Sequence, residues 1–229
     1  MQQVEGTIVE CNTLYGGARS NNRVHRHLIK DHGFDASAPV DIMDEEGSME
    51  LPVTDGDHLK VDLVGSHLAN YDFMVVLNHF KGHAMGGFGG ALKNLSIGVA
   101  SKEGKGLIHN AGPDGSHLDF IEAMAEAADA VSDYFGHGER LLYISVMNNM
   151  SVDCDCDSHP AAVDMHDIGI LASLDPVALD QACVDLVYQA PDGTALIERM
   201  ESRQGSAILP HAEKMGLGQR HYQFVSLDQ

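Results

Sequence analysis

The 229-residue sequence has little positive charge and few prolines. Fourteen Lys and Arg residues stand against 34 Asp and Glu residues, so the formal net charge is −20 at pH 7. A surface with this charge repels phosphate backbones and anionic lipid, which argues against nucleic-acid and membrane partners. Seven prolines, 24 glycines and 44% hydrophobic residues are values of a globular chain, and they exclude the disordered and collagen-like classes.

Long apolar runs and a secretion signal are also missing. The longest apolar runs, such as residues 73–77, fall far below the roughly 20 residues that a membrane helix needs. The N-terminal residues after Met1 have neither a basic start nor an apolar stretch, so we expect a cytoplasmic protein. The cysteines are too few and too unevenly spaced for a disulfide framework, and free thiols are expected at Cys11, Cys154, Cys156 and Cys183.

The apolar pattern predicts an α/β fold, with a mixed, mostly parallel sheet flanked by helices, in a single domain over residues 1–229. The clearest strand is 71–78, a continuous apolar run, and the clearest helix is 118–135, with apolar residues three and four apart. Further strands are predicted at 5–11, 39–43, 51–53, 59–64, 141–147, 168–172 and 222–226, and further helices at 18–31, 177–188 and 207–215.

Cys154 and Cys156 flank a single aspartate in an acidic segment that follows the predicted strand 141–147. Two thiolates so close together, with carboxylates and His159 nearby, suit a transition metal, and zinc or iron is the first expectation. A C-x-C pair supplies only two of the four ligands of a tetrahedral site, so the others must come from elsewhere in the fold. The alternatives are an acidic loop with two incidental thiols and a redox-active thiol pair.

His79, Lys81 and His83 alternate with other residues just after the strand 71–78. In an extended segment, residues two apart point the same way, so these three side chains are expected to face one cavity. Neutral imidazole is a common metal ligand, which makes His79 and His83 candidates to complete the metal site. Lys81 is better suited to an anionic ligand. Alternatively, all three are ordinary loop residues in a His-rich chain.

A glycine-dense stretch, 86–90, leads into a predicted helix start and Lys93. Backbone N–H groups at such a start, together with Lys93, can hold a phosphate or carboxylate, so Gly89, Gly90 and Lys93 are predicted to bind an anion. Neither the P-loop spacing nor the dinucleotide-binding spacing is present. The alternative is that the glycines allow close backbone packing beside a buried helix.

The loop after the first predicted strand offers polar groups at Asn12, Thr13 and Arg19. They can orient a polar ligand, or Asn12 and Thr13 can cap the following helix while Arg19 pairs with a carboxylate. Because ligands of open α/β sheets bind beyond the carboxyl ends of the strands, we expect the segments with His79 to His83, with the glycines 86–90 and with Cys154 and Cys156 to form one pocket.

Together these segments resemble the domain of unknown function family 362, whose members are often labelled uncharacterised iron-sulfur centre proteins. The resemblance is carried by NTLYGGARS at 12–20, LNHFKGHAMGGFGGALKN at 77–94, and DCDCDSHP and DIGILASLDPVALDQACVDLV within 153–187. It extends from Glu10 to about residue 218. It implies a common core fold and a site in these loops, but no substrate.

Two departures from the family pattern limit what the resemblance implies. Many relatives carry a ferredoxin-like insertion with C-x2-C-x2-C-x3-C-P runs after the segment that matches 101–109, where this chain has only 110–117. The iron-sulfur clusters of that insertion therefore cannot be transferred to it. Relatives also usually have an extra strand before Glu5, so we expect a short form of the family.

Three functions remain open on the sequence. The first is a metal-binding protein, with or without a redox role, in which Lys81 or Lys93 holds an anionic substrate and Asn12 orients it. The second is a binding module or non-metal enzyme for a small phosphorylated or carboxylated molecule. The third is a non-catalytic subunit of a redox complex, as a homodimer or with a ferredoxin-type partner. The sequence does not decide whether the protein is an enzyme.

Overall fold

A three-stranded sheet in the order β5-β8-β9 lies at the centre of the computed structural model, which describes residues 6–112, 115–154, 157 and 159–227. β5 (Met74–His79) and β8 (Leu141–Met147) are parallel, with Leu77 opposite Ile144, and β9 (Gly169–Ser173) runs antiparallel to β8. Buried and less buried residues alternate along β5 and β8, because successive side chains of a strand point to opposite faces.

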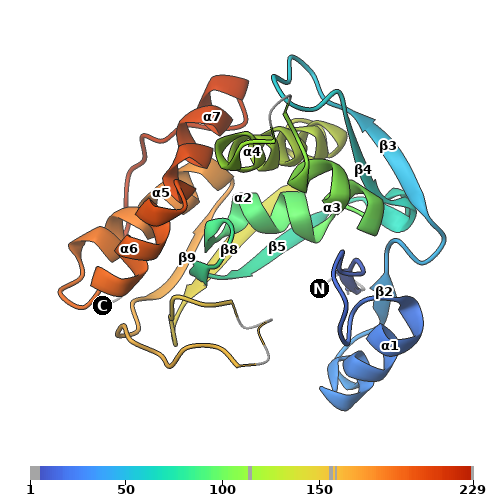
Figure 1. Ribbon diagram of the computed structural model, residues 1–229, viewed down its shortest axis with the longest axis horizontal. Helices are drawn as coiled ribbons and strands as arrows, with labels where there is room; N and C mark the ends of the chain where they lie inside the picture. The colour runs from blue at the N-terminus through green and yellow to red at the C-terminus, as the bar shows by residue number, and fades with distance from the viewer. Residues whose placement is uncertain (1–5, 113–114, 155–156, 158, 228–229) are drawn as a thin grey trace.

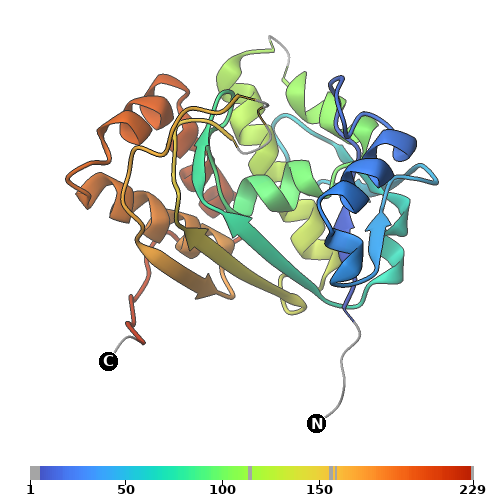
Figure 2. The ribbon, with the colours of Figure 1, turned by 90° about the horizontal axis from the view of Figure 1, so that it is seen from below.

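Helices cover only one face of this sheet (Figure 2). α5 (Pro176–Gln189) packs against β8 and β9 on the covered face. The opposite face exposes apolar side chains: Val75 is 50%, Leu77 is 62% and Ile170 is 72% exposed. The buried side chains, from Cys11 near the N-terminus to Ala212 near the C-terminus, form one hydrophobic cluster on the helical side.

α4 (His117–Tyr134) is the longest helix among the described residues. Its start is set by a capping box, in which the Ser116 hydroxyl accepts from the Asp119 amide and the Asp119 carboxylate accepts from the Ser116 amide. Its many alanines allow neighbouring elements to approach closely, and α7 (Ile208–Met215) packs along it. In the part of the chain that the structure describes, no helix is both long and apolar enough to cross a membrane.

The N-terminal unit lies at the lower right of Figure 1, and its buried Cys11 belongs to the main hydrophobic cluster. β1 (Ile8–Glu10) and β2 (Val40–Ile42) pair in parallel and are connected through α1 (Asn22–Asp31). β3 (Ser48–Pro52) and β4 (Val61–Gly65) follow as an antiparallel pair. The loop between β3 and β4, residues 53–60, reaches α4.

The chain after β5 turns at once into a second antiparallel pair, β6 (Lys81–His83) and β7 (Gly87–Gly89). α2 (Ala91–Lys93) follows and continues into a π-helical turn, Asn94–Gly98. The remaining helices are α3 (Lys102–His109) and α6 (Thr194–Ser202).

The predicted α/β class is confirmed, but the predicted predominance of parallel strands is not found. Among the described residues, two strand pairings are parallel and three are antiparallel. The antiparallel share arises because β9 returns along β8 and the glycine-dense stretch folds as a hairpin. The predicted strand 222–226 has no strand pairing in the structure, and the hairpin β6-β7, α3 and α6 were not predicted.

Candidate functional site

The loops after β5 and β8 meet, because these strands are parallel neighbours. The Gly82 amide donates to the Ser151 carbonyl at 2.8 Å, and the ring Nε2 of His79 lies 2.6 Å from the Asn148 carbonyl. A Cβ atom at Gly82 would overlap the backbone of Val152, so only glycine allows this approach. The segment that leads to Cys154 is thus pressed directly against β6.

Lys81 and Lys93 converge over the backbone of β7. In the hairpin, Lys81 lies opposite Gly89. A Cβ atom built on Gly89 would be 3.5 Å from Cε of Lys81 and 3.9 Å from Cδ of Lys93, and one built on Gly86 would be 3.5 Å from Cδ of Lys93. The two predicted lysines therefore lie side by side, and both pass over the glycine backbone of β7.

His83 lies beside these lysines and is held in the neutral form. Its Nδ1 accepts hydrogen bonds from the amides of Met85 at 3.2 Å and Gly86 at 2.9 Å, so Nε2 carries the ring proton. Burial, followed by the positive charges of Lys93 and Lys81, lowers the pKa of His83 to about 3. The site therefore contains an uncharged imidazole whose Nε2–H is a hydrogen-bond donor.

Arg199 of α6 and His109 of α3 complete the cluster. The charge of Arg199 lowers the pKa of His83, and so does His109 in its protonated form, although burial lowers the pKa of His109 itself. The guanidinium of Arg199 donates to the Val152 carbonyl at 2.7 Å and to Asp153 Oδ1 at 3.1 Å, which ties α6 to the loop before Cys154. We call Lys81, Lys93, His83, His109 and Arg199 the basic cluster. Arg199 and His109 were not among the predicted site residues, since neither follows a predicted strand.

The amides at the start of α2 already have a partner. The carboxylate of Asp180, fully buried on α5, accepts from the Ala91 amide at 2.7 Å and the Leu92 amide at 2.9 Å. Gly90 packs directly against this carboxylate. The glycines thus provide the close packing that was the alternative interpretation of the sequence, and Asp180 occupies the helix start where an anion was expected.

Asn12, Thr13 and Arg19 lie with the N-terminal unit. Asn12 donates to Asp44 and Asn22, the Thr13 hydroxyl donates to the Tyr15 carbonyl, and Arg19 pairs with a glutamate. Their loop approaches the basic cluster through Tyr15 instead. The ring of Tyr15 meets His109 edge to face, with centroids 5.8 Å apart, and its hydroxyl lies 3.7 Å from the Met85 sulfur.

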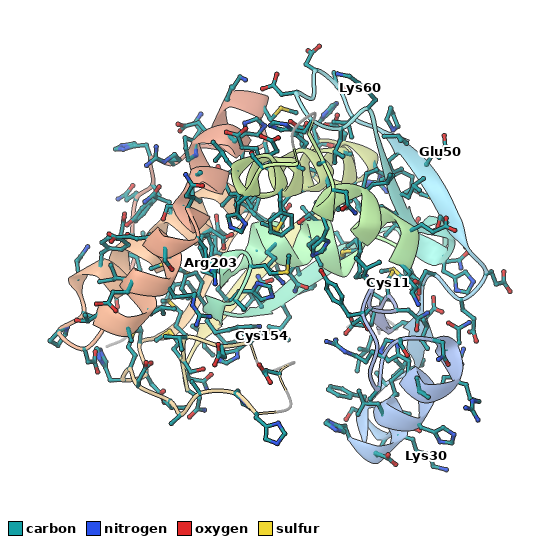
Figure 3. The ribbon with its side chains drawn as sticks, viewed as in Figure 1. Cys11, Lys30, Glu50, Lys60, Cys154 and Arg203 are labelled. Atoms are coloured by element: carbon teal, nitrogen blue, oxygen red, sulfur yellow. The ribbon has the colours of Figure 1, made fainter. Side chains whose placement is uncertain are left out.

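The described cysteines do not gather around one centre. Cys11 is buried and donates to the Val99 carbonyl, and Figure 3 shows it well apart from Cys154. Cys183 is buried on α5, where burial raises the pKa of its thiol. Cys156 lies outside the described residues. Four thiolates around one iron-sulfur cluster do not fit this arrangement, since Cys11 and Cys183 are buried in separate surroundings.

Side chains that could hold a metal ion also meet at a place that the sequence did not predict. Ligand atoms of His58, Glu122 and His211 all lie within 4.8 Å of one another, as do those of Asp57, Glu126 and His211. The four-residue spacing of Glu122 and Glu126 could have indicated from the sequence that both carboxylates lie on one helix face. Nothing in the sequence indicated that His58 and His211 join them, because these histidines come from distant parts of the chain.

The comparisons with known proteins agree with the resemblance noted in the sequence. The chain matches the family described as Domain of unknown function (DUF362) over residues 2–185 of its 229 residues, and it belongs to that family. No curated protein and no solved structure matches it. Arg199 and His211 lie beyond the matched segment.

Proposed function

We propose that the protein binds a small anionic molecule, one carrying a phosphate or carboxylate group, at the basic cluster. The observation that carries the proposal is the convergence of Lys81 and Lys93 on Gly89, beside the neutral His83. Two ammonium groups attract an anion, and the Nε2–H of His83 adds a directional donor without a charge.

The charge balance of the chain supports this proposal. Only 14 of 229 residues are Lys or Arg, yet Lys81, Lys93 and Arg199 lie close enough to His83 to lower its pKa together. In a protein of net charge −20, most of the surface repels anions, so a local group of cations directs them to one place. Both lysines also interact with other residues of the chain, with which the anion would compete.

The proposed binding mode differs from the one predicted from the glycines. Side chains, not the amides at the start of α2, hold the anion, because Asp180 accepts from the amides of Ala91 and Leu92. Gly89 lies between the side chains of Lys81 and Lys93, which both pass within van der Waals reach of its Cβ position.

The test is ligand-induced stabilisation of the full chain by inorganic phosphate, pyrophosphate and citrate. A ligand that binds only the native state raises the Tm, and we expect the rise to be lost in Lys81→Gln and in Lys93→Gln. Lys30→Gln is the matched control, since Lys30 is exposed on α1, away from the cluster (Figure 3). An equal rise in Lys93→Gln and Lys30→Gln, or none in the wild type, would refute the proposal.

The metal site predicted at Cys154, Cys156, His79 and His83 stays a prediction. Elemental analysis of the wild type and of Cys154→Ser/Cys156→Ser tests it on the same preparations. Metal lost in the double variant would favour a thiolate site, while metal retained there would place the ion elsewhere.

A further inference from the structure

Three side chains from separate segments meet beside α4. His58 comes from the loop 53–60, Glu122 from α4 and His211 from α7, and their side chains are 11%, 25% and 5% exposed. Their ligand atoms lie within 4.8 Å of one another. Two imidazoles and a carboxylate at such mutual distances are the donor set of many zinc sites.

One nitrogen of His58 is left without a partner. Its Nε2 lies 2.7 Å from Glu122 Oε2, whereas its Nδ1 is buried and has no hydrogen bond. Buried polar atoms in proteins almost always have a partner, so this unpaired nitrogen needs an explanation, in a ring that also meets a carboxylate and a second histidine. A metal ion is a partner that imidazole nitrogen can take without a hydrogen.

His211 is oriented by a carboxylate behind it. Its Nε2 lies 3.1 Å from Oε1 of Glu126, which is fully buried and also accepts from the amides of Asp57, His58 and Leu59. Both carboxylate oxygens of Glu126 accept from backbone amides, Oε1 from Asp57 and His58 and Oε2 from His58 and Leu59. Glu126 therefore acts as an acceptor toward His211 as well, and Nε2 of His211 carries the donated proton.

The other nitrogen of His211 then faces Glu122. With the proton on Nε2, the neutral ring has its lone pair on Nδ1, which lies 3.8 Å from Glu122 Oε1. This distance is too long for a hydrogen bond and places two electron-rich atoms opposite each other. Two ligands of one ion, each about 2.0–2.2 Å from it, can be separated by this distance.

We propose that His58, Glu122 and His211 bind a divalent transition-metal ion of the zinc class. Glu126 acts as a positioning residue, because a carboxylate that accepts from the far nitrogen of a ligand histidine fixes its tautomer and raises its basicity. The ion joins the loop 53–60 and α7 to α4, so the site has a structural role in addition to the proposed anion binding.

Asp57 is not a ligand in this proposal. Its carboxylate is 2.6 Å from Nζ of Lys214, and Glu126 already accepts from four donors. Asp57 and Glu126 therefore have partners within the protein and need no metal ion. A hollow of about 360 Å³ lies next to His58 and is lined also by Leu107 and Asn110.

The test is titration of metal-free, untagged full chain with Zn²⁺ by calorimetry. We expect one tightly bound ion per chain, with affinity reduced roughly 100-fold or more in His58→Gln and His211→Gln. His137→Gln is the control, since the His137 side chain is 84% exposed and pairs only with Asp133 among the contacts of its ring. If His211→Gln fails to fold, Glu122→Gln at the partly exposed position serves in its place.

Cobalt substitution separates this site from the predicted cysteine site. Co²⁺ bound by nitrogen and oxygen gives visible d–d bands without the ultraviolet charge-transfer band of thiolate ligation, and we expect this spectrum in Cys154→Ser/Cys156→Ser, in which the predicted cysteine site is removed. Weak, non-stoichiometric binding or loss of these bands in Cys154→Ser/Cys156→Ser, or equal affinity in His211→Gln and His137→Gln, would each overturn the proposal.

Discussion

The carboxylate of Asp180 fills the space in which a side chain at Gly90 would begin. A Cβ atom on Gly90 would overlap Oδ1 of Asp180, the oxygen that accepts from the Ala91 amide. Because Asp180 is fully buried, it cannot move aside into solvent. Position 90 is therefore restricted to glycine by tertiary packing, and not by backbone conformation, since its φ of −145° is open to any residue.

We predict that Gly90→Ala lowers the free energy of unfolding by roughly 2–4 kcal/mol, through overpacking and a weakened hydrogen bond to α2. Urea denaturation measures the change. Gly16→Ala is the matched control, because a Cβ there meets nothing within 4 Å, and its effect should stay within about 0.5 kcal/mol. In an Asp180→Ala background the cost of Gly90→Ala should shrink, and purely additive effects would contradict the explanation.

His83 is predicted to remain neutral over the whole range in which ordinary histidines titrate. Two backbone amides donate to its Nδ1, and burial with neighbouring lysines lowers its pKa to about 3. His67 gives the opposite behaviour, because its hydrogen bond to Asp41 raises its pKa. Nitrogen-15 NMR titration should show His67 charged at pH values where His83 carries its proton on Nε2 alone. Protonation of His83 above pH 5 would rule out the assigned form.

Asp62 makes the stability of the fold depend on pH. Both of its carboxylate oxygens are buried and make no hydrogen bond of normal geometry among the described residues. Burial raises the pKa of Asp62 to about 7, although the nearby Leu63 amide and, less strongly, the charge of Lys105 act in the opposite direction. The folded chain thus keeps a proton that the unfolded chain releases near pH 4. The stabilisation from Asp62 is complete below pH 4 and is lost as the pH rises through about 7.

Asp62→Asn should therefore raise the free energy of unfolding at pH 8 by roughly 2–4 kcal/mol and leave it little changed at pH 4. Chemical denaturation at a series of pH values measures both effects. A substitution that shifts stability equally at pH 4 and pH 8 would show that Asp62 is not the titrating group.

The close approach of Gly82 to Val152 predicts a coupling between the two loops. Gly82→Ala would force the backbone of Val152 away and disturb the contacts that Arg199 makes with residues 152 and 153. We expect a several-fold weaker phosphate response and faster limited proteolysis within 150–161. Val163→Ala, at an exposed position after this loop, is the control. Unchanged cleavage in Gly82→Ala would mean that the loop is held by other contacts.

Local sequence determined those helices and strands in which the apolar pattern, the capping residues and the residue preferences all favour the same structure. The strand predicted at 141–147 has those bounds in the structure, because its apolar and β-branched residues suit a strand that neighbours pair on both edges. The helix predicted at 177–188 is α5, started by the Asp175 cap and by Pro176 in its first turn, and the predicted helix 118–135 is α4. Family membership also followed from the motifs alone.

Only the tertiary structure decided how these elements are used. The sequence of the glycine-dense stretch 86–90 is compatible both with an anion-binding loop and with close backbone packing. At Gly90 the structure shows close packing, because Asp180 of α5, far along the chain, lies directly against it. The direction of β9 and the grouping of His58 with His211 likewise depend on long-range contacts. The periodicity of apolar residues indicates which face of a helix or strand is buried. It contains no information about which distant side chains pack against that face, and the proposed sites of this protein are formed by such long-range contacts.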